Sequence, residues 1–554
     1  MFAGLWERLF AKEAHNQGLV SVEPETVLTE LARVRLPPQL DAATSLITKV
    51  LGGSPDIIRR EITVAGARLA VIYIEGLADK SEVERVLNGL LIQRPKVEQV
   101  GLDLGSSLKR WREAGLPVGG IRSGSTLEDV AKALLDGETC LMGTGWDEVL
   151  ILDTTGWEKR AVAEPETEAA VRGPREGFIE NLSTNVSLIR RRLRHPNLRL
   201  EDYTVGELTR TSVTALYIEG IAREKLVDEV RRRLTRIKID GILESCYLEE
   251  LIEDAPFSPF PTILNTERPD VVCAALLEGR VCILTDGTPF ALLVPATFPV
   301  YIMTPEDYNQ RWPVAVGIRV IRYLGLFIVP SLYVAFTTFH QEMLPTPLAV
   351  SLFMQREQVP YPVLVEAVIM QTTFEILTEA GLRLPRPLGQ TIGIVGVLVI
   401  GEATVRAGLI SAAMVIVVSA TAIASYTIPV YDMTQAIRIL RFPMIFLAAT
   451  LGLFGILTGL IIIAIHLVSL RSFGVPFLAG FAPFVRRAQR DIIFRAPWWA
   501  MQTRPELVAS DNRERQGPNL KPKPPESTSS GANETEAEAL GGGNPTGTNG
   551  RKHR

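Results

Sequence analysis

Two long uncharged stretches dominate the hydrophobic pattern of the C-terminal half of the chain. Residues 407–431 contain no Asp, Glu, Lys or Arg, and residues 442–470 contain none either, although His466 interrupts their apolar run. A helix needs about 20 apolar residues to cross the hydrocarbon layer of a membrane. We therefore expect membrane-spanning helices at 409–429 and 442–469.

Two weaker stretches are predicted to cross the membrane as well. The first, 314–338, contains two arginines that can extend toward the headgroups or face protein. The second, 389–408, reaches crossing length if Glu402 and Arg406 pair at i,i+4 spacing near the inner boundary. The expected domain therefore has about four crossings.

The positive charges near the ends of the spans predict the orientation. Arg311 precedes the first span, and Arg471 and Arg486 follow the last one. Lys and Arg collect on the cytoplasmic side, so both termini are expected to be cytoplasmic. Arg438 and Arg441, on the proposed outer side of the last span, count against this arrangement.

A polar helix is expected at 361–380, between the first two spans, as a re-entrant or interfacial element. Glu366, Gln371 and Glu375 would be costly against lipid but suit a wetted vestibule or the headgroup region. Glu366 and Glu375 are nine residues apart, which places them on opposite helix faces, so at most one faces a pore. The candidate pore or gating residues are Glu366, Gln371, Glu375, Glu402 and Arg406.

The N-terminal half contains an internal repeat. Residues 73–78 recur at 217–222, and residues 133–141 recur at 275–283. In each copy an apolar strand-like run ends at Glu-Gly and leads into a helix, and a later helix ends at a glycine before a strand with an inward cysteine. The repeat predicts duplicated α/β modules of roughly 120 residues, a usual domain size.

The expected fold is an α/β soluble part with two duplicated modules, an α-helical multi-pass membrane domain and a disordered C-terminal tail. The tail is rich in Pro, Gly, Ser and charged residues, and it has too few aliphatic side chains to offset the entropy of ordering. We expect disorder from about 504. The predicted boundaries are an N-terminal segment at 1–39, cytoplasmic modules at 40–165 and 166–300, the membrane domain at 301–484 and a cytoplasmic tail at 485–554.

Two sets of charged residues are candidate subunit contacts. Glu75 and Glu219 occupy the same place in the repeat, where each could cap the next helix or contact a ligand or subunit. Arg190, Arg191 and Arg192 form a basic cluster, which is either a solvated helix face or a surface that docks against anionic headgroups or an acidic subunit.

Composition argues against several other functions. The net charge of −4 lacks the basic excess of a nucleic-acid binder, so no nucleic-acid partner is expected. The four cysteines form no C-x-x-C pair, and the five histidines never have metal-ligand spacing. No Gly-rich loop carries the lysine of a phosphate-binding site. We expect no catalytic, cofactor or metal site, and a protein that is not an enzyme.

Several sequence blocks stand out because they occur together in one order. They are Gly173 to Phe178, Leu188 to Arg192, Pro196 to Leu198, Pro256 to Pro261, Thr266 to Asp270, Asp286 to Phe290, Pro330 to Ala335 and Thr338 to Glu342. In these blocks the chain resembles the A-subunit family of spore germinant receptors, the GerA family, which includes the stage V sporulation AF-type proteins. The resemblance extends over roughly residues 40–490 and is weakest before Gly173.

The resemblance implies a multi-pass protein of the spore inner membrane that works with a transporter-like B subunit and a lipoprotein C subunit. It also implies a homo-oligomer, with a pentamer as the state that the family suggests, acting as a ligand-gated ion channel that triggers germination. The alternatives are a stage V AF-type accessory channel or scaffold that amplifies germination, and a secondary transporter. A transporter should show repeated or broken helices in its membrane half.

Overall fold

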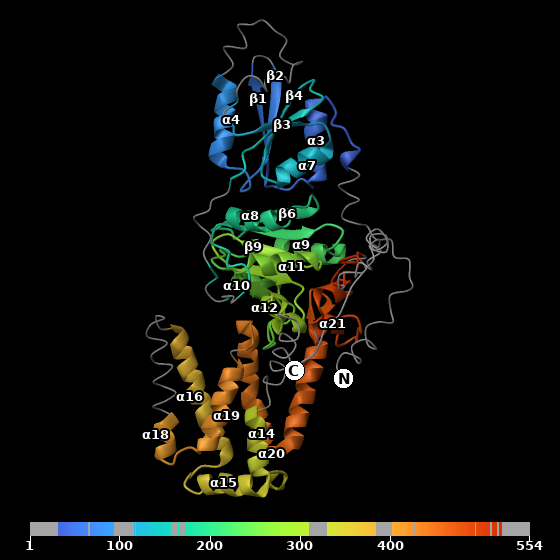
Figure 1. The fold of residues 1–554 in the computed structure, drawn as a ribbon. Helices are drawn as coiled ribbons and strands as arrows, with labels where there is room; N and C mark the ends of the chain where they lie inside the picture. The colour runs from blue at the N-terminus through green and yellow to red at the C-terminus, as the bar shows by residue number, and fades with distance from the viewer. Residues whose placement is uncertain are drawn as a thin grey trace, which may run out of the picture.

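The computed structural model describes residues 31–64, 67–92, 116, 118–156, 164–165, 168, 172–309, 329–383, 401–425, 427–493, 495–509, 512–517 and 520–522. Figure 1 shows them as three parts stacked along one axis, with the first module at one end, the second in the middle and a helical part at the other end. Most of the predicted segment 1–39, parts of the spans 314–338 and 389–408, and the end of the tail lie outside the described residues.

The first module is a five-stranded antiparallel sheet with the order β1-β2-β4-β5-β3. Strands β4 and β5 are buried along their whole length. Helix α7 begins at a capping box in which Thr126 and Asp129 satisfy each other's backbone N–H groups. The elements are α3 Leu40–Val50, β1 Ile57–Val64, β2 Ala67–Ile74, α4 Lys80–Ile92, β3 Ile121–Gly124, α7 Leu127–Leu135, β4 Thr139–Gly143 and β5 Val149–Leu152.

The second module has the equivalent sheet, β6-β7-β9-β10-β8, also antiparallel throughout. Gly137 and Gly279, which follow α7 and α11, both have positive φ, and Cys140 and Cys282 lie buried in the next strands, as the repeat predicts. The elements are α8 Leu182–Arg192, β6 Leu198–Val205, β7 Thr211–Ile218, α9 Glu224–Arg236, α10 Ser245–Ile252, β8 Leu264–Thr266, α11 Pro269–Leu277, β9 Val281–Thr285, β10 Ala291–Val294, η2 Phe298–Tyr301 and α12 Pro305–Asn309.

The helical part is a bundle in which α14, α16 and α19 pack against α20 and one another. The predicted helix at 361–380 is present as α16. Helix α15, at the end of the bundle farthest from the modules (Figure 1), has no buried residues. The elements are α14 Val329–Thr338, η3 Gln341–Met343, α15 Thr346–Arg356, α16 Val363–Arg383, α18 Gly401–Arg406, α19 Ala412–Ser425, α20 Tyr431–Ser469, β11 Arg471–Ser472, β12 Val475–Pro476, α21 Gln489–Ile492 and η5 Trp498–Ala500.

Helix α20 is a helical hairpin that reverses at Gly452. This glycine has φ 63° and ψ −140°, which interrupts the helix. The two arms lie side by side, because a Cβ built on Gly459 would be 2.4 Å from the sulfur of Met444 and 3.1 Å from Leu447. Both ends of α20 consequently reach the second module, where Met433 and Leu467 join the same hydrophobic core.

The reversal corrects the prediction of a single last crossing at 442–469. An uncharged run has the same composition whether it forms one helix or two close arms, so the sequence pattern did not reveal the turn. Arg438 lies on the arm that begins at the second module, the end of the bundle that also carries Arg471, so it no longer counts against the predicted orientation, which stays a prediction. The first arm, 431–451, has 21 residues and the second, 453–469, has 17. At 1.5 Å per residue they are about 32 Å and about 26 Å long, close to the roughly 30 Å of the hydrocarbon layer.

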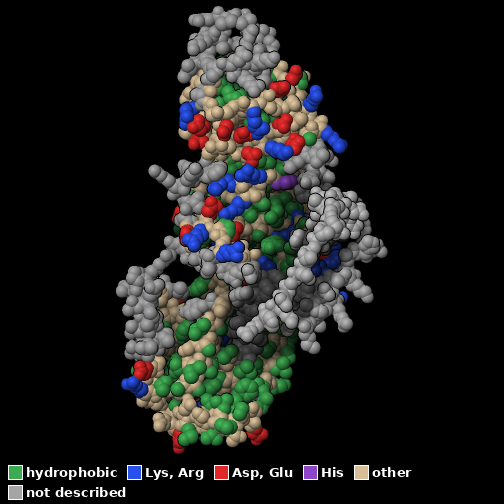
Figure 2. Space-filling view, viewed as in Figure 1, with side chains coloured by type: hydrophobic (Ala, Val, Ile, Leu, Met, Phe, Trp, Pro, Cys, Tyr) green, Lys and Arg blue, Asp and Glu red, His purple; other side chains and the backbone are tan. Residues whose placement is uncertain are grey.

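Among the described residues, Tyr431–Ser469 is the one helix whose length and composition suit a membrane span. Figure 2 shows hydrophobic side chains crowded over the surface of the helical part and charged side chains over the modules. Exposed apolar residues of the bundle include Ile416, Phe446, Phe454, Leu457 and Ile461. Such a large exposed apolar surface is typical of a protein–lipid or protein–protein interface.

The start of the predicted disordered tail is ordered against the second module. Ala509 forms an antiparallel bridge with Ala222, and Thr503 forms another with Glu514. Val508 and Ala509 are buried. The prediction of disorder from about 504 is therefore wrong for residues 504–509, because hydrogen bonds to the module and the burial of Val508 and Ala509 hold this segment in place.

Candidate functional site

A buried ion pair joins the two modules. Arg190, on α8 of the second module, donates from Nε to Asp56 Oδ2 at 2.8 Å and from an Nη to Oδ1 at 3.1 Å. The side chains of Arg190 and Asp56 are only 1% and 8% exposed. Neither the solvated helix face nor the docking surface predicted for Arg190 fits this position. A bidentate pair of this kind fixes orientation as well as distance.

The rest of the basic cluster lies beside that pair. Arg192 donates to Glu176 at 2.7 Å, and Arg191 contacts the same carboxylate at 3.5 Å. Arg194 pairs with Asp136 of the first module at 2.7 Å, in an exposed position. The cluster therefore contributes to contacts within this chain, two of which cross between the modules.

The repeated glutamates do not cap helices. Asp79 accepts from the backbone N–H groups of Ser81 and Glu82 at the start of α4, so Glu75 has no such role. Glu219 binds Arg199 through Nε at 2.7 Å, and the same guanidinium donates to the Val50 carbonyl of the first module at 3.3 Å. Glu219 thus supports a contact between the modules.

The chain beyond α20 enters the core of the second module. The buried hydroxyl of Ser472 donates to the Thr262 carbonyl at 2.6 Å and accepts from the Ala296 N–H at 2.9 Å. Phe473 and Phe477 are buried among residues of this module. The second module and the helical hairpin therefore share a continuous core, which we call the junction.

A charged group reinforces the junction. Arg233 of α9 donates to Asp254 at 2.5 Å and lies 4.0 Å from the centre of the Phe473 ring. The other oxygen of Asp254 accepts from the Phe473 backbone N–H. The ring and the backbone of one residue after α20 are thus held by the two partners of an ion pair.

An acidic groove lies where α10 meets the start of α20. It has a volume of about 400 Å³, and Glu249 and Asp432 both line it. Asn265 donates to Asp432 at 2.8 Å. Burial, followed by the nearby charge of Asp432, raises the pKa of Glu249 to about 8.

In the helical part, α16 is tied to its neighbours by polar side chains. Glu366 is fully buried and accepts from the Ser411 N–H at 2.6 Å and from the Ser411 hydroxyl. Arg356 approaches the other Glu366 oxygen at 3.9 Å. The interfacial alternative, with Glu366 among headgroups, does not fit this position.

Glu375 lies on another face of α16. It forms an ion pair with Arg438 of α20 and accepts from the Gln371 amide at 2.9 Å. Gln371 is buried. The predicted separation of Glu366 and Glu375 onto different faces is therefore present, and each face contacts a different neighbour.

Glu402 and Arg406 pair at 2.5 Å, as their i,i+4 spacing predicts, and both are exposed. Their helix, α18, lies at the end of the bundle away from the modules (Figure 1), and the following Gly408 approaches the Gln358 carbonyl just beyond α15. The predicted position of this pair near the inner boundary of the membrane stays a prediction, and residues 389–400 of the same predicted span lie outside the described residues.

Arg441 is a buried cation that is not among the candidate pore or gating residues predicted from the sequence. It lies in the first arm of α20, 1% exposed, and donates to the Ser425 hydroxyl. Its Nε and one Nη lack hydrogen-bond partners among the described residues. The available signal was an arginine directly beside a long uncharged run, which we interpreted only as an orientation marker.

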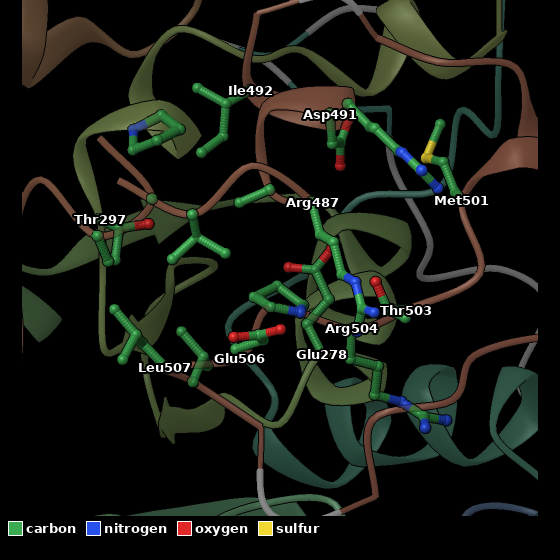
Figure 3. A pocket seen from close by; sticks show the side chains of 18 of the residues that line it. Glu278, Thr297, Arg487, Asp491, Ile492, Met501, Thr503, Arg504, Glu506 and Leu507 are labelled. Carbon is green, nitrogen blue, oxygen red and sulfur yellow. The ribbon is translucent and has the colours of Figure 1, made fainter. Parts of the chain in front are cut away.

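A pocket of about 120 Å³ lies between the second module and the chain after α20. Figure 3 shows Glu278 and Thr297 of the module lining it together with Arg487, Met501 and Leu507 of the later chain. Among the described residues, no three His, Cys, Asp or Glu side chains gather as metal ligands. The pocket presents mixed charge and apolar surface without a nucleophile paired with a base.

Known proteins similar to this chain agree on one family. The sequence profile of the Bacillus/Clostridium GerA spore germination protein family matches residues 45–507. Spore germination protein KA of Bacillus subtilis (strain 168) is 45% identical over 497 residues, 89% of this chain and 90% of that protein. Spore germination protein GerLA of Bacillus cereus is 39% identical over 463 residues, 83% of this chain and 93% of that protein.

A solved structure is also similar. It is the N-terminal domain of the A subunit of the Bacillus megaterium spore germinant receptor GerK3, with 36% identity, a TM-score of 0.39, and coverage of 48% of this chain and 98% of that chain. The extent of the profile match and the identities above establish the family. The chain belongs to the GerA family of spore germination proteins.

Proposed function

We propose that this protein is the A subunit of a nutrient-responsive germinant receptor in the spore inner membrane, and that it oligomerises as a ligand-gated ion channel. The observation that carries the proposal is the junction: one buried core contains residues of the second module and of both arms of α20. A shift of the module therefore moves the helical part, because packed interiors transmit displacement.

The proposed membrane arrangement follows the exposed apolar surface of the bundle. The hairpin of α20 crosses the membrane twice, and the modules and the residues after Ser469 lie together on the cytoplasmic side. Helix α15, with exposed Leu348, Phe353 and Met354, rests in the opposite interface.

The polar residues of α16 are proposed to act in gating. Glu366 and Glu375 each tie α16 to a different neighbour, so a change in either pair alters how α16 packs. One subunit offers few helices to enclose an aqueous pore, so conduction requires several copies around an axis, for which a pentamer is the proposed state. A transporter-like B subunit and a lipoprotein C subunit are the proposed partners.

Reconstitution tests the channel. The purified chain, alone and with its proposed B and C subunits, is placed in liposomes loaded with a potassium-sensitive dye. Flux at channel rates supports the proposal, saturable coupled uptake supports a secondary transporter, and no flux in either preparation supports a scaffold.

A second experiment tests coupling through the junction. About a dozen Gly/Ser residues are inserted after Asn309, where the chain leaves α12, and a matched insertion is made after Gly517. The first insertion should abolish nutrient-triggered ion release at normal protein level, and the second should not. A full response from spores with the first insertion would contradict the coupling.

A further inference from the structure

In the first module, a segment of the same module covers the turn that follows the repeated Glu75-Gly76. Residues 153–156, directly after β5, pass along the turn at 77–79. The Asp79 N–H donates to the Thr154 carbonyl at 2.8 Å, and Ala78 forms an antiparallel bridge with Thr155. A Cβ on Gly137 would lie 2.7 Å from the Leu77 carbonyl oxygen, so this corner is tightly closed.

The second module has the same corner but no such segment after β10. Its chain continues from Val294 into η2, where Phe298 donates its N–H to Phe477 beyond α20 at 2.8 Å. A Cβ on Gly279 would lie 2.8 Å from the Ile221 carbonyl oxygen, matching the corner of the first module. The repeat therefore leaves an open edge beside Ala222, which we call the docking slot and define by Ile221, Ala222, Arg223 and Gly279.

The C-terminal segment Thr503–Ala509 occupies the docking slot. Ala509 forms an antiparallel bridge with Ala222, which stands where Ala78 stands in the first module. Arg223 donates from Nε to the Ala509 carbonyl at 2.7 Å and also donates to the Glu506 carbonyl. The Ala509 Cα lies 3.0 Å from the position that a Cβ on Gly279 would take, so the segment approaches the module closely because residue 279 is a glycine.

A second set of contacts holds the start of the segment. Arg504 donates from Nε to the Leu277 carbonyl, at the end of α11, at 2.8 Å. Its backbone N–H donates to the Arg513 carbonyl at 2.8 Å, and Thr503 forms an antiparallel bridge with Glu514, so residues 503–504 lie beside residues 513–514. The pocket in Figure 3 lies between this segment and the second module, so the segment is not fully packed against the module.

We propose that the docking slot is an interaction surface for an extended chain segment and that its resident is residues 503–509 of the same chain. Residues 503–509 pair with the turn at Ala222 in the same way that residues 153–156 pair with the equivalent turn at Ala78 of the first module. They therefore form a second contact, in addition to the junction, between the chain beyond α20 and the second module. The docking of residues 503–509 does not depend on the proposed receptor function. A role of this docking in coupling the second module to the helical part rests on that proposed function.

Disulfide trapping in the full-length protein tests the position of the segment. Cα atoms in an antiparallel bridge are about 4.5–5.5 Å apart, within the range that a disulfide accepts. The variant carries Ala222→Cys and Ala509→Cys with Cys246→Ser, because Cys246 is the exposed native cysteine. The control combines Ala222→Cys with Leu520→Cys, an exposed position later in the tail.

Positions 222 and 509 should form an intramolecular disulfide at least about tenfold faster than the control pair. Equal rates would mean a loose tail and would overturn the proposal. A cross-linked dimer instead of an intramolecular bond would also overturn it, since the resident would then come from a second copy.

Hydrogen exchange of the purified full-length protein gives an independent measurement. Arg223→Ala removes two hydrogen bonds from a charged donor, so exchange at residues 503–509 should rise roughly tenfold. Arg232→Ala is the matched control, because Arg232 lies on α9, the helix that directly follows Arg223, has a 74% exposed side chain and pairs with Glu229. Unchanged exchange in Arg223→Ala, with the fold intact, would contradict docking, and neither measurement requires germination activity.

Discussion

Arg190 Nε lies 2.8 Å from Asp56 Oδ2, and this buried contact crosses from the second module to the first. Removing one partner leaves the other charge buried without compensation, which costs roughly 3–5 kcal/mol. We expect Arg190→Ala to lower the thermal unfolding midpoint of the modules strongly and to loosen their relative orientation. Calorimetry and small-angle scattering of fragment 31–309 measure the two effects.

Arg194→Ala is the matched control for that substitution. Arg194 also reaches across to the first module, at Asp136, but the pair is exposed and should contribute about 0–1 kcal/mol. Equal destabilisation by the two variants would contradict the special role of the buried pair.

Glu249 predicts a pH dependence at the junction. Its folded-state pKa is raised from 4.5 to about 8, so the folded protein binds this proton more tightly than the unfolded chain does. The free energy of unfolding should therefore fall as pH rises from about 4.5 to about 8. Glu249→Gln should remove this slope and stabilise the protein at pH 9 by on the order of 1–3 kcal/mol.

Denaturant unfolding at a series of pH values measures the effect. Glu250→Gln, at an exposed neighbouring position, is the control and should keep the slope. A slope that persists in Glu249→Gln would show that another group is responsible.

The hairpin at Gly452 predicts which side of the membrane each end of the bundle faces. Gln435 is exposed near the second module, and Gln355 is exposed on α15 at the other end. In a Cys246→Ser background, Gln435→Cys should react with a membrane-impermeant maleimide only from the cytoplasmic side, and Gln355→Cys only from the opposite side. Labelling of both positions from one side would contradict the hairpin topology.

The contact between Glu375 and Arg438 predicts charge rescue. Glu375→Lys places two cations together between α16 and α20, so nutrient-triggered ion release should change and protein level should drop several-fold. The swap Glu375→Arg with Arg438→Glu restores opposite charges and should recover most of the response. Glu402→Lys, in an exposed pair, is the control and should change ion release little. If Glu375→Lys shows normal ion release and the double swap does not restore or improve it, the pair has no role.

Ser472 predicts a polar requirement inside the junction. Ser472→Ala removes the acceptor of the Ala296 N–H and the donor to Thr262, and it leaves buried backbone groups unpaired. The expected cost is roughly 1–3 kcal/mol. Ser469→Ala is the control, since that hydroxyl is exposed and bonds within its own helix. Thermal unfolding of the full chain compares them, and equal midpoints would contradict the prediction.

The sequence alone revealed the repeat because the features that define it depend on residues that are close together in the chain. Strand runs that end at Glu-Gly, and C-cap glycines at Gly137 and Gly279, depend on backbone preferences that neighbouring residues set. The sequence pattern also located α16 and the apolar surface of the bundle. Those signals predicted two similar α/β modules, whereas the equivalent strand orders of their sheets came from the structure.

The tertiary structure alone decided which distant residues meet. Arg190 forms an ion pair with Asp56, 134 residues earlier in the chain, and Ala509 pairs with Ala222 although the whole helical part lies between them in the sequence. The reversal at Gly452 depends on contacts between two arms of the same composition, so hydropathy did not distinguish one long helix from two. Composition records how much apolar surface a segment carries, whereas long-range packing determines where that surface and its charges are buried.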